Sequence, residues 1–125
     1  MTDDTLLLRQ IHPSFVQSGR VTSQAFRPTP KDEFLLSFYD GDRMEPQAAW
    51  QHFVAAPECR SSGVMAVTRA RCLEQDLLVD ADGVPFPEHV SVDFSGFEKN
   101  VIEKKAKLLA RLAQVRGWLY YADQV

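Results

Sequence analysis

The order of its predicted helices and strands places this chain in the α+β class, as a single layered domain. Its length of 125 residues is typical of one domain with one hydrophobic core. Short strand-like and helical segments alternate along it without a repeat or a long linker. The hydrophobic fraction of 45% and the charged fraction of 25% are those of an average globular protein. We therefore expect one domain over 1–125, with an N-terminal extension (1–33) and an α+β core (34–125).

The extension begins with a predicted strand and continues as an ordered loop. Residues 6–11 form a short apolar run that ends at His12-Pro13, where a proline disfavours further regular structure. Residues 14–31 are irregular, although 21–26 has the composition of an extended segment. Pro28 and Pro30 exclude a helix at the end of this loop.

The first half of the core predicts a strand, a helix, a second strand and a helical turn. Residues 34–39 are aromatic and aliphatic and precede the turn sequence Asp40-Gly41-Asp42. Pro46 suits the first position of a helix, and apolar residues repeat at helical spacing over 46–55. Residues 63–68 are apolar on both faces, which is typical of a strand covered on both sides. Residues 69–75 can form one helical turn.

The second half predicts a strand, the longest helix and a last strand. Residues 90–94 alternate apolar and polar side chains. Ser95 and Glu98 have the spacing of a capping box that opens the helix, and Gly117 suits its end. We expect a final strand over 118–122. The expected apolar stripe of the helix consists of Val101, Ile102, Leu108, Leu109, Leu112 and Val115.

From residue 34 onward this order is strand, helix, strand, strand, helix, strand. It is the βαββαβ order of a ferredoxin-like sandwich, in which two helices cover one face of a four-stranded sheet. The N-terminal extension would then add an edge strand or lie across the open face.

Composition and charge disfavour several classes of function. No stretch is apolar enough to span a bilayer, and the acidic N-terminus lacks the pattern of an export signal, so we expect a cytoplasmic protein. The net charge of −3 and the missing RNP-type motif disfavour nucleic acid as a partner. Cys59 and Cys72 do not have metal-ligand spacing, and we expect neither a metal nor a cofactor.

The N-terminal loop is the best candidate for a binding site. Residues 5–31 carry four positive charges and no acid. Guanidinium groups bind oxyanions, and loop hydroxyls and N–H groups can add donors, so the loop could hold a phosphate or a carboxylate. The alternative is that its arginines pair with nearby acids and fix the loop to the domain. The candidate residues are His12, Arg20, Ser23, Gln24, Arg27, Lys31, Asp40 and Asp42.

The sequence leaves the catalytic residues unknown. His12 could act as a base with Ser14 or Ser23 as its nucleophile, and Asp40 or Asp42 could orient it. The chain contains none of the local motifs of hydrolases, such as GxSxG or HExxH, so this arrangement is disfavoured.

The segment HPSFVQSGRVTSQAFRPTPKDE, at 12–33, resembles one in small bacterial proteins of unassigned role. The resemblance implies no activity, cofactor or site residue.

Two functions from different classes therefore remain open. The first is a protein-binding or accessory domain of a bacterial cell, in the manner of an antitoxin or an immunity protein. Its partner would be another protein, and a homodimer is an open alternative. The second is a small enzyme or ligand sensor that uses the basic loop to hold an anionic substrate. A deep pocket with converging polar groups would count against the first hypothesis and for the second.

Overall fold

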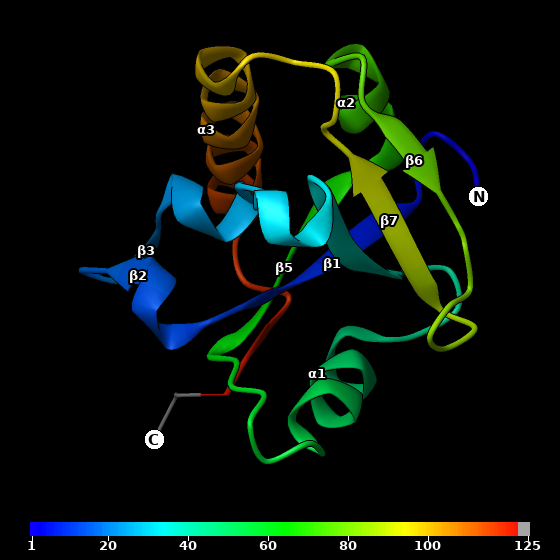
Figure 1. Ribbon diagram of the computed structural model, residues 1–125. Helices are drawn as coiled ribbons and strands as arrows, with labels where there is room; N and C mark the ends of the chain where they lie inside the picture. Colours follow the sequence, from blue (N-terminus) through cyan, green and yellow to red (C-terminus); the bar gives the residue numbers. More distant parts are fainter. Residues whose placement is uncertain (123–125) are drawn as a thin grey trace.

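The computed structural model describes residues 1–122 and confirms the α+β class (Figure 1). Its centre is a six-stranded sheet in the order β6-β7-β4-β1-β5-β8, and each neighbouring pair is antiparallel. These strands are β1 (Leu6–Ile11), β4 (Leu35–Asp40), β5 (Gly63–Thr68), β6 (Leu78–Asp80), β7 (His89–Asp93) and β8 (Tyr120–Tyr121). A separate hairpin joins β2 (Val16–Gln17) to β3 (Arg20–Val21).

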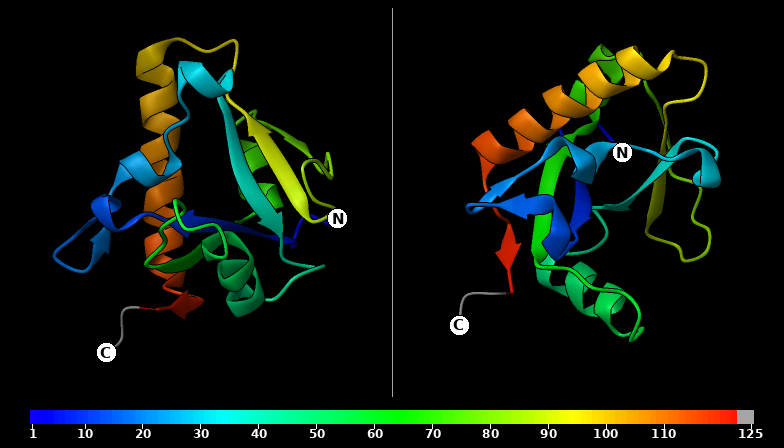
Figure 2. Two further views of the ribbon diagram at one scale, coloured as in Figure 1. Left: turned by 60° about the horizontal axis from the view of Figure 1, so that its bottom comes forward. Right: turned by 60° about the vertical axis from the view of Figure 1, so that its left-hand side comes forward.

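Helices cover both faces of this sheet. They are α1 (Pro46–Val54), α2 (Arg69–Glu74) and α3 (Lys99–Arg116). One core cluster joins α3 and α2 to one face, and a second cluster joins α1 to the other. The right-hand view of Figure 2 shows α3 and α1 on opposite sides of the strands. The fold is therefore a three-layer arrangement with the sheet in the middle.

The expectation that the N-terminal extension adds an edge strand is wrong, because β1 lies in the middle of the sheet between β4 and β5. All six of its residues pair with β5, from Leu6–Thr68 to Ile11–Gly63. Leu7 and Leu8 point to opposite faces, and both are fully buried. A strand with apolar side chains on both faces is stable only where both faces are covered.

The ferredoxin-like topology is not confirmed. In that order the second and third strands of the βαββαβ unit would pair, but β5 and β7 lie far apart in the sheet because β1 and β4 separate them. The two long helices also cover opposite faces instead of one. Between β1 and β8, β5 is a central strand with apolar side chains on both faces, so it needs cover on each side.

The longest helix begins later than its predicted cap. Its N-cap is Glu98, whose side chain makes no capping hydrogen bond, so the capping box with Ser95 is wrong. The N–H of Ser95 instead donates to Asp93 Oδ1 at 2.7 Å, which holds a turn before the helix. Val115, expected on the apolar stripe, is exposed because the face of α3 that is buried runs through Ile102, Ala106, Leu109, Ala110 and Ala113, and position 115 lies on another side of the helix.

The loop between β1 and β4 is more regular than expected. Three 3-10 helices lie in it, at Pro13–Phe15, Ser23–Phe26 and Pro30–Asp32. The expected extended stretch over 21–26 is wrong beyond Val21, because Ala25 and Phe26 turn inward and are fully buried against α3. Strand β6 was not predicted, since three residues are too few to give a pattern.

None of the helices in residues 1–122 combines the length and the apolar composition that a membrane span requires.

Candidate functional site

The sheet opens between β1 and β4. These two strands pair at Leu7–Asp40 and Leu8–Tyr39, and there the register ends. Beyond that point they diverge, as the left-hand view of Figure 2 shows. A cavity of about 390 Å³ lies where the second half of β1 faces the first half of β4. The loops at 58–60 and 85–89 and the helix α1 complete its walls.

Arg9 supplies a cation to this cavity. Its Nε donates to the Ala25 carbonyl at 2.7 Å, and its Nη1 donates to the Ser37 carbonyl at 3.0 Å. These bonds replace the backbone pairing that β1 and β4 have lost, and they use two of the five N–H donors of the guanidinium group. Arg9 makes no ion pair with any residue in 1–122. Burial lowers its pKa to about 10, against the weaker opposing effect of the Asp32 charge.

A polar acceptor without a partner also belongs to the cavity wall. Gln10 donates from Nε2 to the Ala49 carbonyl at 3.0 Å, which fixes the orientation of its amide. Its Oε1 is buried and accepts no hydrogen bond from residues 1–122. This oxygen has almost no accessible surface, so the amide belongs to the closed part of the wall.

Aromatic rings form most of the apolar wall of the cavity. Tyr39 stacks on Phe86 with centroids 4.9 Å apart, and its hydroxyl lies 2.8 Å from His52 Nδ1 on α1. Burial, with smaller effects of Cys59 and Glu88, raises the pKa of Tyr39 to about 12, so the phenol stays protonated at neutral pH. The aromatic residues that line the cavity are Phe15, Phe38, Tyr39, Phe53 and Phe86.

At the edge of the cavity, His89 connects an acid to a serine. Its Nδ1 lies 2.7 Å from Asp82 Oδ1, and its Nε2 lies 3.0 Å from Ser37 Oγ. Because a carboxylate accepts, Nδ1 carries the proton of the neutral ring, and Nε2 is left to accept from the Ser37 hydroxyl. Ser91 donates to the other oxygen of Asp82 at 2.7 Å.

The Asp82 carboxylate is held in its charged form. Burial by itself raises the pKa of this carboxyl group, but hydrogen bonds from His89 and Ser91 lower it by more. The charge that His89 carries when doubly protonated and a hydrogen bond from the backbone N–H of Val84 act in the same direction, so the net pKa lies below its usual range. An ionised acid at this position fixes the orientation of the His89 ring.

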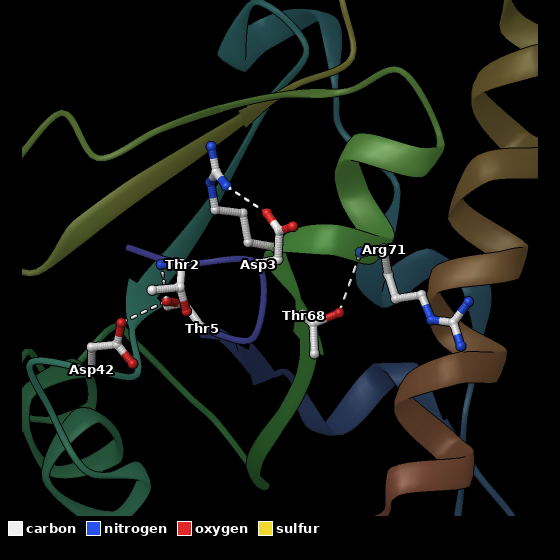
Figure 3. Close-up of polar contacts among 7 residues, drawn as sticks. Thr2, Asp3, Thr5, Asp42, Thr68 and Arg71 are labelled. Atoms are coloured by element: carbon white, nitrogen blue, oxygen red, sulfur yellow. Dashed lines mark hydrogen bonds and ion pairs between the residues drawn. The ribbon is translucent and has the colours of Figure 1, made fainter.

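The structure does not gather the eight loop residues predicted from the sequence into one site. His12 lines the cavity of Arg9, and its Nδ1 lies 2.8 Å from Ser14 Oγ. Asp40 and Asp42 lie at the opposite end of β1, where Thr5 donates to Asp42 Oδ2 at 2.5 Å (Figure 3). The suggested pairing of His12 with an orienting Asp40 or Asp42 is therefore wrong.

Three of the remaining loop residues line two other, shallower cavities. Arg20 and Ser23 line one of about 340 Å³ against α3, together with Lys107 and Arg111. Lys31 lines another, beside Asp82 and His89. Gln24 is exposed, and its carbonyl accepts from the Arg27 N–H at 3.3 Å. Within residues 1–122 neither Arg20 nor Arg27 forms an ion pair, so the expected pinning of the loop by salt bridges is wrong.

The sequence reasoning missed Arg9, Ser37, Asp82 and His89 as a group. The sequence did contain an indication for Arg9, because this charged residue interrupts the apolar run of residues 6–11. A charged side chain inside a buried strand needs hydrogen-bond partners. The other three look like a strand serine, a turn aspartate and a histidine at a loop end. Within residues 1–122, no three side chains of His, Cys, Asp or Glu are grouped as a metal site would require.

The chain matches no protein-family model, no curated protein and no solved structure.

Proposed function

We propose that this protein binds a small anionic molecule with an apolar body in the cavity between β1 and β4. The observation that carries the proposal is Arg9, a half-buried guanidinium group at the cavity that has no carboxylate partner in residues 1–122. Removing an unpaired cation from water is costly unless something compensates its charge. A carboxylate or phosphate group of a ligand would do so, with charge-assisted bonds to the N–H groups that remain.

The rest of the cavity suits the rest of such a ligand. Aromatic rings offer apolar contact to a planar or aliphatic body. A second cation, Arg60, lies at the wall with one acid, Glu58. Counting Arg9, these groups leave a net positive cavity in a protein with a net charge of −3.

This proposal keeps the anionic ligand expected from the sequence but moves it from the N-terminal loop to the cleft in the sheet. A cavity with converging polar groups favours a small molecule over a partner protein, which stays the second hypothesis. The cytoplasmic and bacterial setting also stays an expectation.

Cys59 provides a direct test because its thiol lies in the cavity wall, whereas Cys72 is buried elsewhere and serves as the internal control. We would measure iodoacetamide alkylation of Cys59 by mass spectrometry with benzoate, phenyl phosphate or the uncharged benzamide present. Millimolar benzoate or phenyl phosphate should slow alkylation several-fold, and benzamide should not. The two anions distinguish a carboxylate site from a phosphate site.

Arg9→Met removes the cation and keeps a side chain of similar length. We expect it to abolish protection by the anions. The matched control is Arg43→Met, because Arg43 also donates to a backbone carbonyl, that of Pro87 at 2.9 Å, but lies outside the cavity wall. Equal protection by benzoate and benzamide in the wild type would refute the proposal even if Arg9→Met failed to fold.

A further inference from the structure

We infer that Ser37, His89 and Asp82 form a nucleophilic triad, and that the protein hydrolyses small esters that carry an anionic group. This inference rests on the proposed function, because the cavity of Arg9 would select the substrate. The serine, the histidine and the acid come from β4, from the start of β7 and from the loop before it. The serine and the histidine are 52 positions apart in the chain, so the fold alone brings them together.

The distances match those of a working triad. A nucleophile and its base should lie within about 2.6–3.2 Å, and a third group should orient the base. Here Ser37 Oγ lies 3.0 Å from His89 Nε2, and His89 Nδ1 lies 2.7 Å from Asp82 Oδ1. The tautomer that Asp82 imposes leaves Nε2 free to take the serine proton, as general base catalysis requires.

The exposure of Ser37 and of His89 suits their roles as nucleophile and base. Ser37 is exposed, whereas the side chain of His89 is 10% exposed. A ring held in a fixed orientation beside an accessible hydroxyl is what the base of a nucleophile needs. Ser37 also lines both the cavity of Arg9 and the neighbouring one beside Lys31, so a substrate in either could reach it.

Arg9 connects the triad to the anion site. Its Nη1 donates to the backbone carbonyl of Ser37, and both residues line the same cavity. Its remaining N–H groups could hold a carboxylate of the substrate.

The chemistry balances with water as the second reactant. Ser37 Oγ bonds to the ester carbonyl carbon while its proton passes to His89 Nε2. The bond to the alcohol oxygen then breaks, and the alcohol leaves with that proton. Water attacks the acyl-serine, gives a proton to His89 and releases the carboxylic acid as the proton returns to Ser37. The net reaction is ester plus water to acid plus alcohol.

His12 and Ser14 provide an internal control. This pair is also a histidine and a serine at hydrogen-bond distance, 2.8 Å, but the serine bonds Nδ1, and within residues 1–122 no acid is bonded to the ring. A fluorophosphonate probe, which phosphonylates activated serines with loss of fluoride, should therefore modify Ser37 and leave Ser14 unmodified. Peptide mass spectrometry identifies the modified serine.

The activity test uses the mono-4-nitrophenyl ester of succinate and the neutral 4-nitrophenyl butyrate. We expect the wild type to hydrolyse the anionic ester at a higher kcat/KM than the neutral one. Ser37→Ala and His89→Gln should each reduce kcat at least about 100-fold, the lower range for loss of general base catalysis. Ser14→Ala should leave the rate unchanged. Circular dichroism and urea unfolding would verify that each variant folds.

The outcomes separate this inference from the proposed function. No labelling of Ser37 and no hydrolysis above the Ser37→Ala rate would overturn the triad, even if benzoate still protected Cys59. Equal labelling of Ser37 and Ser14 would overturn it as well. Labelling and hydrolysis at Ser37 without anion protection of Cys59 would support the triad and refute the anion site.

Discussion

Gly63→Ala tests how closely the last strand packs on the sheet. A Cβ at this position would lie 2.3 Å from the Tyr120 carbonyl oxygen and 3.0 Å from both Tyr121 Cα and Trp118 Cε3. Ordinary contact begins at 3.4 Å, so β8 must move outward by about 1 Å to admit the methyl group, since close-packed interiors have no spare room.

The cost follows from what holds β8 in place. The N–H of Leu119 donates to the Val64 carbonyl at 2.9 Å, and the N–H of Ala122 donates to the Ser62 carbonyl at 2.8 Å. Weakening these two backbone hydrogen bonds costs about 1–3 kcal/mol of stability. Forcing an extra methyl group into a packed interior costs about the same when neighbouring atoms shift to admit it. We expect Gly63→Ala to lower the free energy of unfolding by about 2 kcal/mol. For a domain of this size that lowers Tm by about 6–10 °C.

Urea unfolding followed by tryptophan fluorescence is a suitable assay. Trp50 lies 5.3 Å from the Tyr120 ring and Trp118 lies 4.7 Å from the Tyr121 ring, so both report on β8. The matched control is Gly96→Ala, because Gly96 has a φ of +88° but no atom within 4 Å of the methyl group that alanine would add. It should cost only the backbone strain of about 1–2 kcal/mol. An unchanged urea midpoint for Gly63→Ala would refute the placement of β8.

Three further predictions follow from burial and from the His89 network. Phe94→Ala removes a fully buried ring and should cost about 3–5 kcal/mol in urea unfolding, whereas a loss below about 1 kcal/mol would contradict its place in the core. The pKa of Asp82 is lower in the folded state than its ordinary value of 3.8. The ionised carboxylate therefore stabilises the fold at pH values above 3.8, and this stabilisation is lost as the pH falls through the folded pKa. The stability advantage of the wild type over Asp82→Asn should therefore shrink below about pH 4, and an advantage that grew there would exclude the ion-stabilised network. In the native protein iodoacetamide should modify Cys59 and spare Cys72, because burial raises the pKa of the Cys72 thiol to about 12. Equal alkylation rates for the two cysteines would contradict the packing around α2.

Much of the fold could be predicted from local patterns. The alternation of residues 90–94 and the two-sided apolar run at 63–68 correspond to β7 and β5, and Pro46 opens α1 as expected. The two-sided pattern of β5 also correctly predicted cover on both faces. Such patterns are readable because side chains alternate along a strand and repeat along a helix, whatever the rest of the chain does.

The candidate site could not be predicted in this way, because it depends on how strands are ordered. Nothing local places β1 between β4 and β5, and the cleft forms where its register with β4 ends after Leu8–Tyr39. The loop arginines looked like the anion site because their charge is visible in the sequence. Arg9 is the stronger candidate because the fold sets it into a cavity wall without a carboxylate partner in residues 1–122.

The sequence by itself determined the α+β class and most of the strands and helices, since these follow from the spacing of apolar side chains along a short stretch of chain. The tertiary structure alone decided that Ser37, Asp82 and His89 meet, and that Ser37 and His89 line the same cavity as Arg9. Their hydrogen bonds depend on the pairing of β4 with β7, where Ser37 faces Ser91 and Tyr39 faces His89. A shift of one residue in that register would turn each side chain to the other face of the sheet and separate the serine from the histidine.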